Sequence, residues 1–233
     1  MFASISTNVP NPPELGVWFT VKVFEFVLIQ PLTSILLTLI TSLSERVVVE
    51  KEASLVGHSQ GCLVTIETAS RYPDKVKSLS LMGGGGSIPM NPELLNLAEK
   101  GDAKSVDLMM DWAHGPAGHF GGHAVPGLHH INIGGTIVHN GSIKDALGVD
   151  FRACDNYKNG FKAAAKIKCP TLNILGEYDK MIPVKEGKKL ADSIPNSEVV
   201  IIPKCGHMIL LEEAGQSLAV LKRFIIKNHP SKY

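Results

Sequence analysis

The stretch "SLVGHSQGCLV", residues 54–64, decides the fold, because it places a serine, Ser59, between two glycines and between two apolar runs. The short run that ends at the first glycine predicts a buried strand at 52–57, and the run 62–72 before a proline predicts a helix. The Gly-x-Ser-x-Gly pattern alone arises by chance in about one chain in ten of this length. The remainder of the chain must therefore decide whether Ser59 is a nucleophile.

Beyond this turn, strand patterns alternate with helix patterns, which predicts βαβ units and a mostly parallel sheet with helices on both faces. Sheets of this class bind their ligands at the carboxyl ends of the strands. The predicted elements are strands at 75–83, 169–176 and 197–204 and helices at 184–194 and 212–228.

Three polar residues come after three of these strands: Ser59, Asp179 and His207. A serine hydroxyl is a weak nucleophile unless a base accepts its proton and a third group orients that base. Taken singly, an aspartate after a strand is usually a helix cap and a histidine near glycine is usually structural. Together, in this order and each at a strand end, they predict a catalytic triad.

Three segments carry a resemblance to a known family: "LVGHSQG" (55–61), "PTLNILGEYDKMIP" (170–183) and "VVIIPKCGHMILLEE" (199–213). On the basis of these three segments, the chain resembles the α/β-hydrolase superfamily over about residues 44–227. The resemblance implies the α/β-hydrolase fold with a helical cap insertion, and catalysis through an acyl-enzyme that water releases without a cofactor. The N–H of Gln60, directly after the nucleophile, is the expected first oxyanion donor.

The resemblance also divides the chain. The predicted core comprises 47–87 and 161–233, and residues 88–160 form the inserted segment, here termed the cap. Residues 1–46 are an atypical apolar segment. In the cap, Met109 and Trp112 either line an apolar substrate pocket above Ser59 or pack the interior of the cap itself.

The cap is also rich in histidine, which raises the question of a metal site. The spacing of these residues gives no i, i+4 helical pair with a nearby acidic ligand, and no cysteine joins them before Cys154. We therefore expect no metal. The six residues are His114, His119, His123, His129, His130 and His139.

The overall composition limits the partners. The 233 residues carry a net charge of +1, which gives no reason to expect nucleic acid or an anionic membrane. The four cysteines show no framework spacing, which favours reduced thiols and a cytoplasmic protein. The expected partner is a small-molecule acyl substrate, and the oligomeric state is left open. The apolar run 23–43 predicts a buried strand and helix, with a membrane anchor not excluded.

The N-terminal segment differs most from the family. Relatives carry a His-Gly loop there that supplies a second oxyanion donor, and residues 1–50 hold no such loop. The N–H groups of Val17 and Trp18 are the replacement candidates, and 16–29 is a candidate substitute strand. Two functions therefore stay open. One is a serine hydrolase, carboxylesterase-like, acting on an ester or related acyl bond of a small apolar substrate; the other is a catalytically weak or inactive hydrolase-like binding protein.

Overall fold

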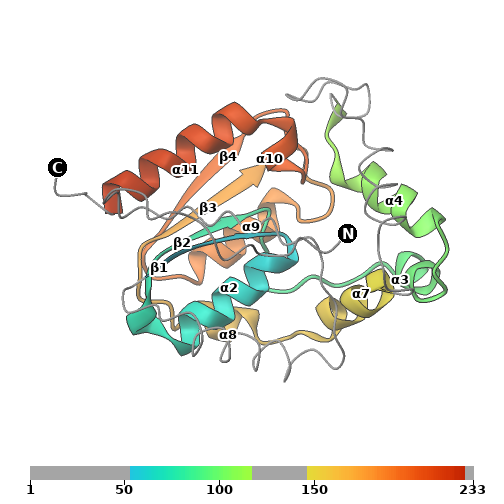
Figure 1. The fold of residues 1–233 in the computed structure, drawn as a ribbon, viewed down its shortest axis with the longest axis horizontal. Helices are drawn as coiled ribbons and strands as arrows, with labels where there is room; N and C mark the ends of the chain where they lie inside the picture. The colour runs from blue at the N-terminus through green and yellow to red at the C-terminus, as the bar shows by residue number, and fades with distance from the viewer. Residues whose placement is uncertain (1–52, 117–145, 229–233) are drawn as a thin grey trace, which may run out of the picture.

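The computed structural model describes residues 53–116 and 146–228 (Figure 1). The expectations placed on the N-terminal segment 1–46 lie outside the described residues. These include the strand and helix at 23–43 and the donors Val17 and Trp18. All the cap histidines except His114 lie outside as well.

Among the described residues, the core is a four-stranded sheet in which every neighbouring pair of strands is parallel. A helix stands between each strand and the next along the chain, so the alternation predicted from the sequence is confirmed and the fold is α/β (Figure 1). The strands stand in chain order: β1 (Ala53–His58), β2 (Val76–Met82), β3 (Thr171–Gly176) and β4 (Ser197–Ile202).

The register brings the carboxyl ends of the strands to one edge of the sheet. His58 is paired with Met82 at the ends of β1 and β2, and Gly176 is paired with Ile202 at the ends of β3 and β4. The residues directly after these strands therefore emerge along the same edge.

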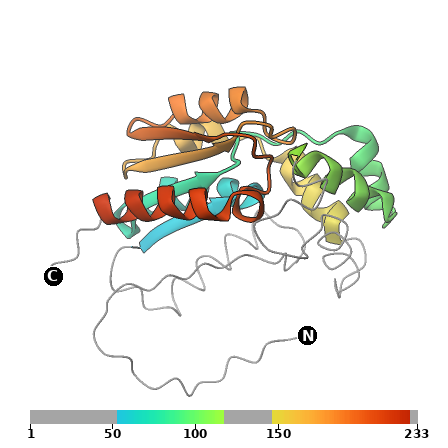
Figure 2. The ribbon, with the colours of Figure 1, turned by 90° about the horizontal axis from the view of Figure 1, so that it is seen from above.

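Helices cover both faces of the sheet (Figure 2). Leu79 and Leu81 of β2 pack toward α2, α8 and α9, whereas Met82 packs toward α10 and α11. Since both of its faces are covered, β2 is buried at every position except Lys77. The bounds are α2 (Gln60–Arg71), η1 (Pro73–Lys75), α8 (Gly160–Ala164), α9 (Val184–Asp192), α10 (Ile209–Glu212) and α11 (Ala214–Asn228).

The described part of the cap packs around a core of its own, here termed the cap cluster, beside the sheet (Figure 1). Asn91 starts its first helix by accepting hydrogen bonds from the backbone N–H groups of Glu93 and Leu94. The helices are α3 (Pro92–Glu99), α4 (Lys104–Ala113) and α7 (Ala146–Asn156). The buried residues of the cap cluster are Leu94, Leu95, Ala98, Val106, Met109, Met110, Ala113 and Phe151.

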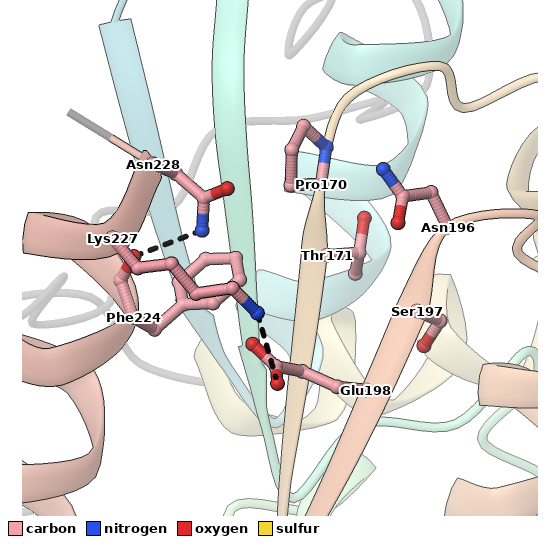
Figure 3. Close-up of a pocket in the computed structure, with 8 residues that line it drawn as sticks. All are labelled: Pro170, Thr171, Asn196, Ser197, Glu198, Phe224, Lys227 and Asn228. Atoms are coloured by element: carbon pink, nitrogen blue, oxygen red, sulfur yellow. Dashed lines mark hydrogen bonds and ion pairs between the residues drawn. The ribbon is translucent and has the colours of Figure 1, made fainter.

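A shallow hollow of about 170 Å³ lies at the opposite, amino-terminal end of β3 and β4 (Figure 3). Lys227 and Glu198 form an ion pair across it at 3.7 Å. It is lined by Pro170, Thr171, Asn196, Ser197, Glu198, Phe224, Lys227 and Asn228.

Within the described ranges, none of the helices has the length and apolar character needed to cross a membrane.

Candidate active site

Ser59 stands on a strained turn between β1 and α2. Its φ of 54° and ψ of −123° lie in a region that non-glycine residues rarely adopt, at a cost of about 1–3 kcal/mol. Its N–H donates to the carbonyl oxygen of Met82 at 2.9 Å, which ties the turn to the end of β2. The Ser59 hydroxyl makes no capping bond to α2, so helix capping does not occupy it.

Of the two glycines that flank Ser59, the structure shows a steric need for one. A Cβ on Gly57 would lie 2.6 Å from both the Gly61 carbonyl oxygen and Thr65 Oγ1. A Cβ on Gly61 would meet no atom of the described part within 4 Å. The close approach of strand and helix that the sequence pattern suggests therefore depends on Gly57.

Gln60 is the first residue of α2. The first N–H groups of a helix have no acceptor within the helix, and they form the positive end of its dipole. The backbone N–H of Gln60 therefore offers a donor directly beside Ser59, in the position where a developing negative charge would be stabilised.

Asp179 and His207 form a buried pair at the ends of β3 and β4. His207 Nδ1 donates to Asp179 Oδ2 at 2.7 Å, and both side chains are almost wholly inaccessible to solvent. The other carboxylate oxygen, Oδ1, accepts from the N–H groups of Met181 and Ile182 at 2.9 and 2.8 Å. A neutral imidazole that donates from Nδ1 keeps its lone pair on Nε2, so this pairing fixes the tautomer that can act as a base.

Gly83, directly after β2, lies against this pair. Its φ is +55°, and a Cβ there would stand 3.0 Å from His207 Nδ1 and 3.4 Å from Asp179 Oδ2. The preceding residue, Met82, accepts the hydrogen bond from Ser59. The end of β2 therefore contacts both the Ser59 turn and the His207–Asp179 pair. Even a methyl group at this position would press on the His207 ring.

His58 links the Ser59 turn to His207. Its Nε2 lies 2.8 Å from the His207 carbonyl oxygen, and the two rings are 5.0 Å apart. Burial, and secondarily the neighbouring His207, lowers the pKa of His58 to about 4. The ring is therefore neutral at physiological pH and donates from Nε2 to the His207 carbonyl oxygen, so it supports the site structurally and does not transfer a proton.

The predicted residues Ser59, Gln60, Asp179 and His207 thus gather at one edge of the sheet. His207 Nε2 is buried and has no hydrogen-bond partner among the described residues. Because Nδ1 donates to Asp179, the lone pair on Nε2 can accept a proton. Gly83 and His58 carry no sequence signal strong enough to place them here, because their contacts form only on folding.

The structure places the predicted pocket residues in the cap. Met109 is buried in the cap cluster, and Trp112 packs against it partly exposed. That location matches the packing alternative, and their contact with a substrate stays a prediction. His114 is fully buried, with Nδ1 2.9 Å from the Met110 carbonyl oxygen. Within residues 53–116 and 146–228 no His, Cys, Asp and Glu side chains gather into a metal-binding group.

Comparison with a family model identifies the fold. Residues 49–116 and 132–214 match the family described as alpha/beta hydrolase fold. Among solved structures, a thermophilic esterase superposes with a TM-score of 0.67 at 29% identity, covering 87% of this chain and 75% of its own. The meta-cleavage product hydrolase from Pseudomonas fluorescens superposes with a TM-score of 0.63 at 18% identity, covering 82% and 70%.

Two curated relatives show how far the sequence similarity extends. The monoacylglycerol lipase ABHD6 of Bos taurus is 36% identical over 64 residues, 28% of this chain and 19% of its own length. The 2-hydroxy-6-oxononadienedioate/2-hydroxy-6-oxononatrienedioate hydrolase of Burkholderia vietnamiensis is 26% identical over 184 residues, 74% and 62%. The chain therefore spans less than two thirds of the length of these relatives.

Proposed function

Because the chain belongs to the α/β-hydrolase fold family, we propose that it is a serine hydrolase that cleaves an ester or related acyl bond of a small apolar substrate. The observation that carries the proposal is the buried His207–Asp179 hydrogen bond at the same sheet edge as the strained turn of Ser59. An aspartate that orients a histidine, at the same edge as a serine on a strand-to-helix turn, is the arrangement that activates a hydroxyl.

The reaction assigns one task to each residue. Ser59 Oγ attacks the substrate carbonyl while His207 Nε2 accepts the hydroxyl proton, and Asp179 stabilises the imidazolium that results. The N–H of Gln60 donates to the oxyanion. The leaving group takes the proton from His207, and a water molecule then releases the acyl group from Ser59 by the same steps.

The choice of an ester rests on two kinds of support. The names of several similar proteins describe esterases, and one describes a lipase that acts on monoacylglycerol. Met181 and Met208, which belong to the core and lie within two residues of Asp179 and His207 in sequence, pack against the apolar cap cluster. An apolar acyl chain suits such surroundings better than a charged one, because burying an unpaired charge is costly.

The test is covalent labelling of the full chain with a fluorophosphonate probe, with the labelled peptide mapped by mass spectrometry. We expect labelling at Ser59, its complete loss in Ser59→Ala, and no change in Ser193→Ala, whose hydroxyl donates to the carbonyl oxygen of Lys189 at the end of α9. Wild-type protein that labels should also hydrolyse p-nitrophenyl butyrate. A folded chain that does not label would instead support the alternative, a hydrolase-like binding protein.

A further inference from the structure

Glu212, at the end of α10, holds a carboxylate that is buried with only 7% of the residue exposed. It accepts three backbone hydrogen bonds. Oε2 accepts from the N–H groups of Gly115 at 2.7 Å and Gly206 at 3.1 Å, and Oε1 accepts from Met208 at 3.2 Å. Gly206 and Met208 are the residues on either side of His207, so the carboxylate accepts from the N–H groups of both residues that flank it.

The same histidine segment is held from the cap by a second acceptor. The carbonyl oxygen of Ala113, the last residue of α4, accepts from the N–H of His207 at 2.7 Å and from that of Met208 at 3.1 Å. These five hydrogen bonds join residues 113–115 of the cap, residues 206–208 and Glu212, and a sixth runs from the N–H of Glu212 to the Met208 carbonyl oxygen.

The two backbone segments approach each other so closely that glycine is required on both. A Cβ on Gly206 would overlap the N atom of Gly115, and a Cβ on Gly115 would lie 2.9 Å from both Glu212 Oε2 and the N atom of Gly206. The contact is thus built into the backbone of both segments, and the carboxylate of Glu212 sits between them.

From this arrangement we propose that Glu212 is a positioning residue for His207, joining the end of the cap helix α4 to the histidine segment. The proposal rests on the proposed function, because a fixed imidazole matters only if His207 transfers protons. Three donors meet two carboxylate oxygens at this position. A glutamine amide has one acceptor oxygen and places an N–H₂ group against at least one of the donors, so Glu212→Gln releases part of the support without changing the size of the side chain.

The experiment compares Glu212→Gln with Glu213→Gln, a substitution of the neighbouring carboxylate, which bonds Gln216 on the surface. The number of active sites is titrated with the fluorophosphonate probe, and kcat and KM for p-nitrophenyl butyrate are expressed per titrated site. Because a misplacement of about 1 Å costs on the order of 100-fold, we expect Glu212→Gln to lower kcat by about 10- to 100-fold with KM within twofold. Glu213→Gln is expected to match the wild type.

A second variant approaches the contact from the cap. Gly115→Ala leaves Glu212 intact and pushes the two segments apart, so it is expected to lower kcat per titrated site in the same way. A kcat within twofold of wild type in Glu212→Gln overturns the proposal. So does a Glu212→Gln chain that fails to fold while Glu213→Gln folds, since that outcome assigns Glu212 to stability.

A readout independent of catalysis separates this proposal from the proposed function. The Nδ1–H proton of His207, shared with Asp179, is followed by NMR of ¹⁵N-histidine-labelled protein. We expect its resonance in the wild type and in Glu213→Gln, and a shifted or broadened resonance in Glu212→Gln. If the wild type does not label at Ser59, the proposed function fails, and an unchanged resonance in Glu212→Gln then overturns the positioning role as well.

Discussion

The two sides of the site are held in place in different ways. Ser59 is positioned by its own backbone conformation and by Gly57 two residues before it, with one hydrogen bond to Met82. Apart from the nearby Glu212, His207 is positioned by partners far away in sequence: Asp179 lies 28 positions away and His58 lies 149 positions away. The serine side is therefore encoded locally, whereas the histidine side depends on the assembled fold.

The largest effect is expected on the histidine side, from Asp179→Asn. An asparagine amide donates to Nδ1 and favours the imidazole tautomer with its proton on Nε2, which cannot accept the serine proton. In a serine protease the corresponding change lowers kcat about 10⁴-fold, and we expect a loss of that order in p-nitrophenyl butyrate hydrolysis. Asp74→Asn, at an exposed position in η1, is the control. Equal activity of the two variants would show that Asp179 does not orient His207.

An intermediate effect is expected on the serine side, from alanine at the two glycines that flank Ser59. The methyl group of Gly57→Ala collides with Gly61 and Thr65, so the free energy of unfolding should fall by about 1–3 kcal/mol. Gly61→Ala has space and lies in a helix, so stability should be unchanged or rise by up to about 1 kcal/mol. Urea unfolding measures both. Equal losses in the two variants would contradict local encoding through Gly57.

The smallest effect concerns His58, which connects the Ser59 turn with His207. It is expected in the pH dependence of the free energy of unfolding. Because its pKa in the folded chain is about 4, against 6.5 unfolded, the unfolded chain binds a proton that the folded chain does not. Its contribution to stability is therefore present above pH 6.5 and is lost as the pH falls toward 4. Replacement by His58→Gln, which keeps a donor for the His207 carbonyl, should make the decline shallower by at most about 1.4 kcal/mol per pH unit.

Asp150, which is buried, changes the pH dependence of the wild-type stability in the opposite direction. Burial raises the pKa of Asp150 to about 6, so the folded chain binds this proton more readily and gains stability as the pH falls below 6. The contribution of His58 is therefore obtained from the difference between the unfolding free energies of the wild type and His58→Gln at each pH. Unfolding free energies measured between pH 7 and pH 4.5 that run parallel for the two proteins would show that His58 does not titrate abnormally.

The sequence predicted the sheet and the serine, aspartate and histidine positions because those signals are local. A strand ending in glycine before a helix, and polar residues directly after strands, can be recognised without knowing what packs against them. The four described strands begin and end within two residues of the predicted positions. The strand after the Ser59 helix, for example, was expected at 75–83 and spans Val76–Met82.

The supports formed between distant segments could not be predicted from the sequence. The sequence pattern predicts no helix in the range of α7, and the packing of α7 against α3 in the cap cluster stabilises this helix. In the sequence, Glu212 cannot be distinguished from a surface carboxylate near a helix end. Its hydrogen bonds to Gly115 and Gly206 are visible only in the structure. Likewise, the sequence does not show that Gly83 lies against the His207 ring.

The burial of the cysteines has a practical consequence for measuring the distance between the cap and the sheet. All four are free and buried, and burial raises the pKa of each thiol, to about 12 for Cys62 and Cys154. Maleimides react with thiolates, so the native chain should remain almost unlabelled at neutral pH. A pair of cysteines introduced at exposed Asp107 in α4 and exposed Lys222 in α11 would then carry the only fast-reacting thiols. Two dyes at these positions would report the distance between cap and sheet in single molecules, before and after acylation.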